Sequence, residues 1–198
     1  KSFTEGAPTY WGEQSYIGAP AYIGASVIFL FIFALFLVRG KLKWWIVGGS
    51  ILALFLSLGD NFAGLTKFFI ENVPLYNKFR EVSSIQVLIE LLLPIAAVIG
   101  LHQLFNDFNT KEARRKALLT SGGIVSGLLL VFYLLGSSLF DFQAPYDADV
   151  AAALGEAGPV LIEGIQADRI TVFKADSLRS LGLVLATIAV LFGLLKNA

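Results

Sequence analysis

The chain has 198 residues, of which 56% are hydrophobic and only 15% are charged, and its mean hydropathy is +0.73. A soluble domain has to cover its surface with polar and charged side chains, so this composition excludes an ordinary soluble protein and favours a membrane protein. The formal net charge is zero, and no nucleic-acid partner is expected.

The residue inventory also limits the chemistry that the chain can perform. Cysteine is absent, which excludes disulfide bonds and thiolate metal sites, and His102 is the single histidine. We therefore expect neither a metal site nor a cofactor. The chain opens at Lys1 without a sequence that resembles a signal peptide, and it contains no methionine. It is expected to be an internal or C-terminal fragment of a longer protein.

Five apolar runs dominate the sequence, and four of them have the length that the hydrocarbon core of a bilayer requires. The five runs cover residues 21–38, 44–58, 85–104, 117–140 and 178–195. The second is shorter and needs flanking residues or local thinning of the bilayer to span. Buried helices of a soluble protein rarely give five such runs separated by short polar segments. The sequence therefore predicts an all-α fold, a polytopic transmembrane bundle of about five spans plus interfacial helices, forming one transmembrane region over residues 1–198.

The charged residues between these runs predict how the chain is oriented. Basic residues are concentrated between runs one and two, between runs three and four, and after run five: Arg39, Lys41, Lys43, Lys111, Arg114, Arg115, Lys116 and Lys196. The loops 59–84 and 141–177 fall on the other side, and the second of them is rich in acids. The positive-inside rule then places the N-terminal end outside and the C-terminal end in the cytoplasm of a bacterial inner membrane.

The outer loop 59–84 is predicted to contain a short amphipathic helix that lies at the membrane interface. Apolar residues recur at helical spacing from Leu65 to Val73, until Pro74 ends the run. Lys78 and Arg80 follow, close to the expected level of the phospholipid head groups. These two cations either anchor the chain at the interface or bind the phosphate of a lipid-linked substrate, for which the planar fork of arginine is suited.

Glu90 is the most informative single residue, because a carboxylate within a membrane span usually faces a bundle interior or a wet cavity. Pro94 removes the helical hydrogen bond of the Glu90 carbonyl, so a charge and a helix defect coincide. Gln86 lies one turn earlier on the same face. The hypothesis is a polar cavity lined by Gln86 and Glu90, and the alternative is a structural carboxyl group satisfied by a neighbouring helix.

The second outer loop is predicted to hold two helices. The first is short, is capped by Asp147 or Asp149 and runs through Leu154. The other begins at Val160 and continues into the last span. On the second helix a set of charged residues falls close to one face: Arg169, Asp176 and Arg179. This stripe is either an ion-pair strut or a further part of the polar cavity wall.

Small residues suggest where helices approach each other closely. Gly49 and Ala53 have the required spacing on the second predicted span, and Gly123 and Gly127 have it on the fourth. Both pairs are expected to contact a neighbouring helix.

Three stretches resemble YfhO-family membrane proteins of the Bacteroidetes type: PTYWGEQSYIGAPAYIGA (8–25), LSLGDNFAGLTKFFIENVPLYNKFREVSS (56–84) and ADRITVFKADSLRSLGLVL (167–185). That family is similar to GT-C-fold glycosyltransferases, which take a sugar from a polyprenyl-phosphate carrier at the outer face and act on cell-envelope polymers. The resemblance implies a polyprenyl-phosphate sugar donor, membrane lipids and the remaining helices of a longer protein as partners. The catalytic acid of GT-C enzymes typically lies in a first outer loop with no counterpart here, so the resemblance identifies no residue of this chain as catalytic, and whether the chain is an enzyme is left open.

Two other functions fit the same features. A transporter also needs polar groups within the membrane and interrupted helices, and a non-catalytic scaffold for envelope assembly needs only the helices. No internal repeat of the kind common in transporters is found among the five runs, which favours the transferase-like function.

Overall fold

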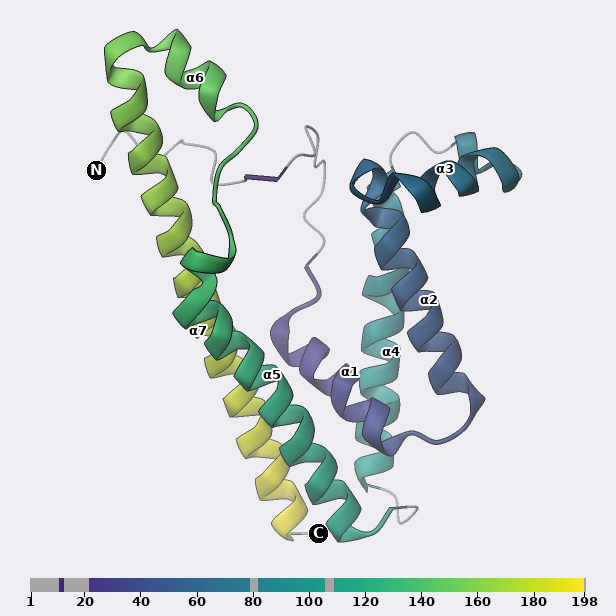
Figure 1. Ribbon diagram of the computed structural model, residues 1–198. Helices are drawn as coiled ribbons and strands as arrows, with labels where there is room; N and C mark the ends of the chain where they lie inside the picture. Colours follow the sequence, from purple (N-terminus) through teal and green to yellow (C-terminus); the bar gives the residue numbers. More distant parts are fainter. Residues whose placement is uncertain (1–10, 13–21, 79–81, 106–108, 198) are drawn as a thin grey trace. The chain divides into compact units, whose positions relative to one another are not determined.

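A computed structural model describes residues 11–12, 22–78, 82–105 and 109–197, and within them the chain is helical and contains no strand (Figure 1). The α-helices are α1 (Ala25–Leu37), α2 (Lys41–Ser57), α3 (Ala63–Asn72), α4 (Gln86–Phe105), α5 (Lys111–Leu139), α6 (Asp147–Ala153) and α7 (Gly158–Asn197). Short 3-10 turns occupy Gly59–Phe62, Tyr76–Lys78, Val82–Ile85 and Gly155–Ala157. The predicted all-α fold is confirmed.

Three helices are long and apolar enough to cross a membrane, judged by length and composition: α4, α5 and α7. They indicate a membrane-associated protein. The apolar runs predicted near the start of the chain form α1 and α2, which have 13 and 17 residues and are shorter than a typical span. All five predicted runs are thus helical, and the count of five spans stays a prediction.

Helix α7 is much longer than the apolar run that it contains. Its 40 residues extend over about 60 Å, twice the roughly 30 Å thickness of a hydrocarbon core. Only part of α7 can therefore lie within a bilayer. If the predicted span 178–195 is the embedded part, the first twenty residues of the helix project beyond it.

The chain divides into two compact units. Unit 1 comprises Lys1–Ile17 and Ile124–Leu185, and unit 2 comprises Gly18–Gly123 and Ala186–Ala198. Helices α5 and α7 contribute one part to each unit.

The core of unit 2 is formed where α1 and α2 pack against α4. Its buried apolar residues are Phe29, Phe33, Ala34, Leu37, Ile46, Ala53, Leu56, Ile89, Leu93, Ala96, Ala97 and Leu104. The closest approach is at Gly100 of α4, where an added Cβ would lie 2.6 Å from the Cβ of Ala34 and 2.9 Å from its Cα. Glycine at this position lets the backbones of α1 and α4 touch.

The expected close contacts of small residues are present on α2 but not on α5. A Cβ added to Gly49 would lie 3.1 Å from the Leu92 side chain of α4, and Ala53 is buried in the same packing. Around Gly123 and Gly127, no other part of the described chain lies within 4 Å of an added Cβ. The structure therefore shows no close helix contact at this second pair, because the spacing of small residues on one helix does not reveal which face a neighbour covers.

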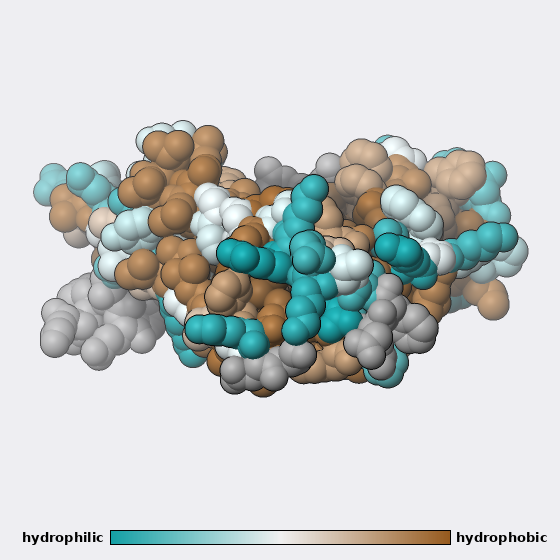
Figure 2. All heavy atoms as spheres, turned by 90° about the horizontal axis from the view of Figure 1, so that it is seen from below, coloured by the Kyte–Doolittle hydropathy of each residue, from teal (hydrophilic) through white to brown (hydrophobic). Residues whose placement is uncertain are grey.

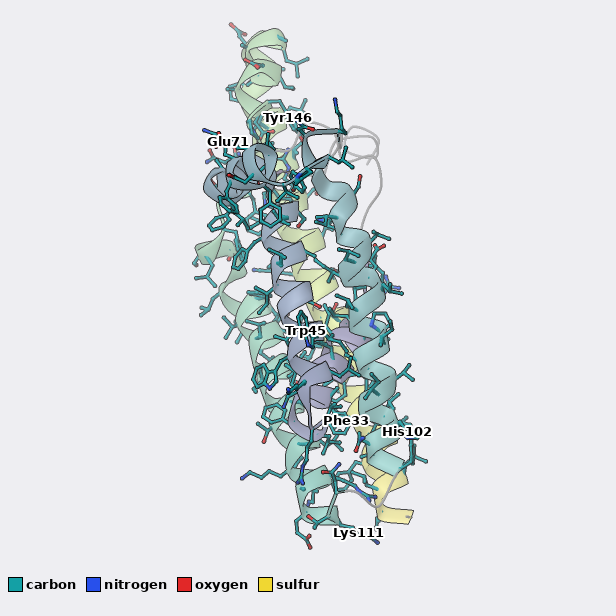
Figure 3. The ribbon with its side chains drawn as sticks, turned by 90° about the vertical axis from the view of Figure 1, so that its right-hand side faces the viewer. Phe33, Trp45, Glu71, His102, Lys111 and Tyr146 are labelled. Carbon is teal, nitrogen blue, oxygen red and sulfur yellow. The ribbon has the colours of Figure 1, made fainter. Side chains whose placement is uncertain are left out.

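The basic segments of unit 2 lie together at one end. The α1–α2 connection, the start of α5 and the end of α7 are at the bottom of Figure 1, and α3 is at the opposite end. Figure 2 views this bottom end and shows hydrophilic side chains gathered among apolar ones. In Figure 3, Glu71 of α3 and Lys111 of α5 mark the two ends. The basic segments are thus separated from α3 within unit 2, and which end faces the cytoplasm stays a prediction.

Lys43 stabilises the turn between α1 and α2 at the basic end. Its Nζ donates a hydrogen bond to the carbonyl of Leu35 over 3.0 Å and lies 5.1 Å from the centre of the Trp44 ring. A cation at a helix C-terminus complements the unsatisfied carbonyls and the helix dipole. The Lys43 ammonium group therefore stabilises the α1–α2 turn electrostatically.

The predicted helix in the first outer loop is confirmed as α3. It ends at Asn72, just before Val73 and Pro74, as the loss of a backbone N–H at proline requires. The buried hydroxyl of Thr66 donates to the carbonyl of Gly59 over 2.9 Å and ties α3 to the turn after α2. Phe68 remains 56% exposed, as expected for a helix at a membrane interface.

Unit 1 is organised around an aromatic cluster, which we define as Trp11, Phe132, Phe140, Phe142 and Phe173. Phe173 of α7 is its centre, with ring centroids 5.4 to 6.4 Å from the other four rings. Aromatic pairs at these separations contribute attraction beyond the burial of apolar area. The cluster joins α7 to the end of α5 and to the segment that follows it.

The two helices predicted in the second outer loop are both present, as α6 and α7. Helix α7 begins at Gly158, two residues before the predicted start, with Pro159 in its first turn, where a missing N–H costs nothing. The residue that precedes α6 is Tyr146, and it makes no capping hydrogen bond through its side chain. The prediction that Asp147 or Asp149 caps α6 is therefore wrong, and the carboxylate of Asp147 has another partner.

Candidate functional site

The residues predicted to bind lipid phosphate are only partly described. Lys78 ends the short turn Tyr76–Lys78 and is exposed at the α3 end of unit 2. Arg80 lies outside the described residues. The pairing of these two cations around a phosphate group stays a prediction.

Gln86 and Glu90 lie at the α3 end of α4, one helical turn apart on the same face. Gln86 is half-buried and Glu90 is exposed, whereas Ile89 and Leu93 turn inward to the core of unit 2. Helix α4 continues unbroken through Pro94. Within the described part of the chain, Glu90 forms neither an ion pair nor a hydrogen bond. The Glu90 carboxylate therefore has to be hydrated or bound by a part of the protein that the structure does not describe.

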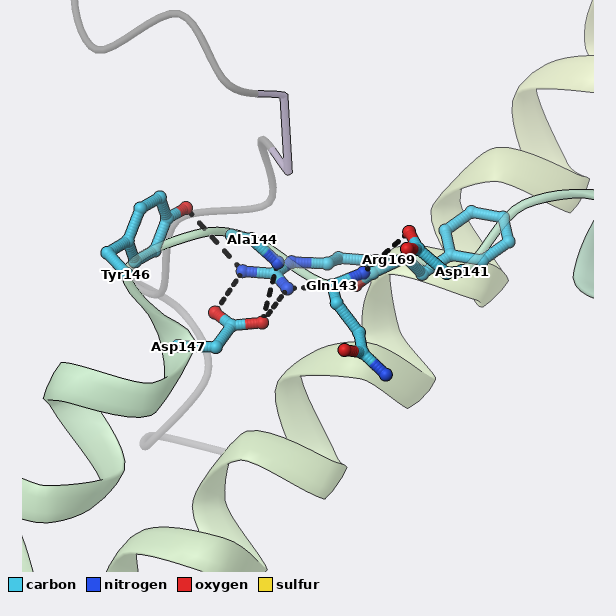
Figure 4. A network of polar contacts seen from close by, with 7 residues as sticks. Asp141, Gln143, Ala144, Tyr146, Asp147 and Arg169 are labelled. Atoms are coloured by element: carbon cyan, nitrogen blue, oxygen red, sulfur yellow. Dashed lines mark hydrogen bonds and ion pairs between the residues drawn. The ribbon is translucent and has the colours of Figure 1, made fainter.

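A buried ion pair between Arg169 and Asp147 is the main polar feature of unit 1 (Figure 4). The Arg169 Nη1 donates to Asp147 Oδ2 over 2.6 Å, and Nη2 donates to Oδ1 over 2.9 Å. Nη1 also donates to the carbonyl of Phe142 over 2.9 Å, and the Tyr146 hydroxyl lies 3.5 Å from Nη2. This two-point contact uses the planar fork that lysine lacks.

The two partners of this buried ion pair each stabilise the charged form of the other. The Arg169 side chain is fully buried and that of Asp147 is 9% exposed. The hydrogen bond from Arg169 holds the pKa of the Asp147 carboxyl below its usual value, and the backbone N–H of Ala144, which donates over 2.8 Å, adds to this; burial acts in the opposite direction. The carboxylate is therefore held ionised.

Phe142 connects the ion pair to the aromatic cluster. Its φ of 51° lies in the left-handed region, which residues other than glycine rarely adopt. In this conformation its carbonyl faces Arg169 while its ring is buried 5.4 Å from that of Phe173. The hydrogen bond to Arg169 and the ring contact with Phe173 together stabilise this strained backbone conformation. Segment 140–147 is thereby fixed against α7.

The predicted charged stripe on α7 is not continuous. Asp176 and Arg179 are exposed and form no ion pair with each other, and Arg169 is turned inward to Asp147. The ion pair that does form, between Arg169 and Asp147, thus joins α7 to α6 and does not join two turns of α7. Whether Gln86, Glu90 and these three residues line one polar cavity stays a prediction, because they belong to different units.

The sequence analysis did not predict the pairing of Arg169 with Asp147, although the position of Arg169 indicated that it needs a partner. Arg169 lies four residues from both Ile165 and Phe173, so it falls on the apolar face of its helix. A cation on such a face has to be paired. The sequence does not identify the partner, because Asp147 is 22 residues away and several other acids lie nearby.

The described residues include no group of three or more histidine, aspartate or glutamate side chains placed to hold a metal ion. His102 is exposed near the end of α4, at the basic end of unit 2. Comparisons with protein-family models, with curated proteins and with solved structures find no match to this chain. The resemblance to YfhO-family proteins therefore rests on the three quoted stretches.

Proposed function

We propose that the chain is the membrane-embedded part of a bacterial inner-membrane protein that handles a lipid-linked sugar at the outer face. In this proposal the protein resembles transferases that use polyprenyl-phosphate sugars in cell-envelope glycosylation. Three helices suited to crossing a membrane and an interfacial-type helix α3 support it. The chemistry of transfer would come from parts of the protein beyond these residues.

The observation that carries the proposal is the exposed Glu90 on α4. A carboxylate that faces lipid within the hydrocarbon core is unfavourable: insertion measurements give about 3 kcal/mol for aspartate at the bilayer centre, and less for a position nearer the end of a span, such as Glu90 in the second turn of α4. Glu90 follows Gln86 on one face of a helix whose other face is packed in the core. A water-filled cavity or a polar partner on this face removes the cost. A cavity that opens at the α3 end would suit the polar head of a lipid-linked substrate.

In this proposal, Lys78 and Arg80 bind the phosphate group of that substrate. Lys78 is exposed between α3 and the turn that leads into α4, so it is available at the level where head groups are expected. Arg80 is two residues further along the chain and would add a planar, two-point contact. The apolar tail would lie along the exposed surface of α3 and α4.

The test is binding of a polyprenyl phosphate to the full-length protein in nanodiscs, measured against phosphatidylglycerol as the competing anionic lipid. We expect selective binding of the polyprenyl phosphate, reduced at least tenfold by Lys78→Ala combined with Arg80→Ala. Lys67→Ala is the matched control, because Lys67 is also exposed at this end but lies on α3. The control should bind within twofold of the unsubstituted protein.

Two results would contradict the proposal. Equal affinity for both lipids would leave no role for a polyprenyl carrier and would favour a transporter or an assembly scaffold. An equal loss in the Lys67 control would show general attraction of charge to anionic lipid.

A further inference from the structure

Helices α5 and α7 form a basic groove at the end of unit 2 opposite α3. The groove is lined by Lys111, Arg115, Phe192, Leu195 and Lys196 and has a volume of about 360 Å³. Sites for small molecules are typically about 300–1,000 Å³. The groove is therefore large enough for a head group, and three of its five lining residues are cations.

The three cations are available for a ligand. Lys111, Arg115 and Lys196 are exposed, and within the described chain none of them forms an ion pair with a carboxylate. Glu112, the acid in the first turn of α5, does not line the groove. Like charges held together without a counter-ion repel each other, and an anion in the groove would remove that repulsion.

The apolar part of the groove favours a lipid over a free anion. The guanidinium carbon of Arg115 lies 5.8 Å from the centre of the Phe192 ring, which orients the cation over an aromatic face. Phe192 is 39% exposed, and Leu195 lies one turn further along α7. A ligand that fits has an anionic head followed by an apolar chain.

We propose that this groove binds the phosphodiester head group of an anionic phospholipid, with an acyl chain against Phe192 and Leu195. The position agrees with this ligand, because the groove lies where the apolar part of α7 ends, beside the basic residues at the start of α5. Basic pockets between transmembrane helices on the cytoplasmic side are suited to such lipids. This site is distinct from Lys78 and the proposed sugar-lipid site, which lie at the other end of unit 2.

The test compares phosphatidylglycerol with phosphatidylcholine by native mass spectrometry of the purified protein. Replacing all three groove cations, as Lys111→Gln with Arg115→Gln and Lys196→Gln, should lower the affinity for phosphatidylglycerol at least tenfold and leave phosphatidylcholine unchanged. The matched control removes three exposed cations from the same end but outside the groove: Arg39→Gln, Lys41→Gln and Lys116→Gln. It should stay within twofold of the unsubstituted protein.

Two further arms separate the lipid from a soluble phosphate. Phe192→Ala should weaken phosphatidylglycerol binding severalfold because the acyl chain loses its contact, and it should not alter binding of glycerol 3-phosphate. Arg115→Lys keeps the charge and should give a smaller loss than the triple variant. Equal losses in the groove and control variants, or binding of glycerol 3-phosphate as tight as that of the lipid, would overturn the proposal.

Discussion

Arg169 of α7 and Asp147 of α6 form a buried two-point ion pair, with donor–acceptor distances of 2.6 and 2.9 Å. The pair closes the segment that follows α5 onto α7. The carbonyl of Phe142 accepts a further hydrogen bond from Arg169, and the backbone N–H of Ala144 donates one to Asp147. Breaking a buried pair leaves one charge without compensation, which costs far more than the pair itself contributes.

Replacing Arg169 by alanine should therefore destabilise unit 1 strongly. We expect a loss of about 3–5 kcal/mol, because the Asp147 carboxylate would stay buried without its cation. Unfolding in SDS, followed by tryptophan fluorescence, measures the difference. Arg179→Ala is the control, since Arg179 is exposed and should change stability by less than about 0.5 kcal/mol. Similar effects of the two substitutions would refute the structural role of the pair.

The same pair makes stability depend on acid pH. The Asp147 carboxyl has a folded-state pKa below its ordinary value of 3.8, so its contribution is fully present above that value and is lost as the pH falls through the lower folded-state pKa. The thermal midpoint of the protein should exceed that of Asp147→Asn at pH 6. The gap should narrow below about pH 4, because the unfolded chain then binds a proton at Asp147 while the native carboxylate is still ionised. A gap that is constant down to pH 2 would contradict this assignment.

The helices follow from the sequence, because apolar runs of this length have few alternatives to helix in a chain so poor in charge. The sequence also predicted the start of α7 to within two residues, at Val160 against the observed Gly158. It did not reveal that α5 starts at Lys111, since the polar first turns of that helix carry no apolar run. The partner of Arg169 and the contact between Gly100 and Ala34 were also missed. Both depend on distant segments meeting, which local pattern does not encode.

Gly100→Ala tests the close approach of α1 and α4. The new methyl group would lie 2.6 Å from the Cβ and 2.9 Å from the Cα of Ala34, so a helix backbone has to move. We expect a loss of about 1–3 kcal/mol, as for overpacking in other cores. Gly123→Ala is the control, because an added Cβ there meets no atom within 4 Å. If both substitutions are neutral in SDS unfolding, the α1–α4 contact is not as described.

The orientation can be tested by cysteine labelling, because this chain contains no cysteine of its own. Asn72→Cys at the end of α3 and Glu112→Cys at the start of α5 mark the two ends of unit 2. In intact spheroplasts, an impermeant maleimide should label the cysteine at position 72 at least tenfold more than that at 112, which should react only after lysis. The reverse pattern would invert the predicted orientation, and equal labelling would contradict a membrane crossing between the two.

Water accessibility of position 90 in the membrane decides whether this face of α4 lines a polar cavity. Glu90→Cys in the otherwise cysteine-free chain should react with a charged, impermeant maleimide applied from the outside, because the proposed cavity on this face of α4 contains water. Val98→Cys, an exposed apolar position on the same helix, should stay unlabelled as a lipid-facing control. Labelling of position 90 alone would support a cavity open to the outer face. Absence of labelling at position 90, with position 72 labelled in parallel, would contradict the cavity and the function proposed from it.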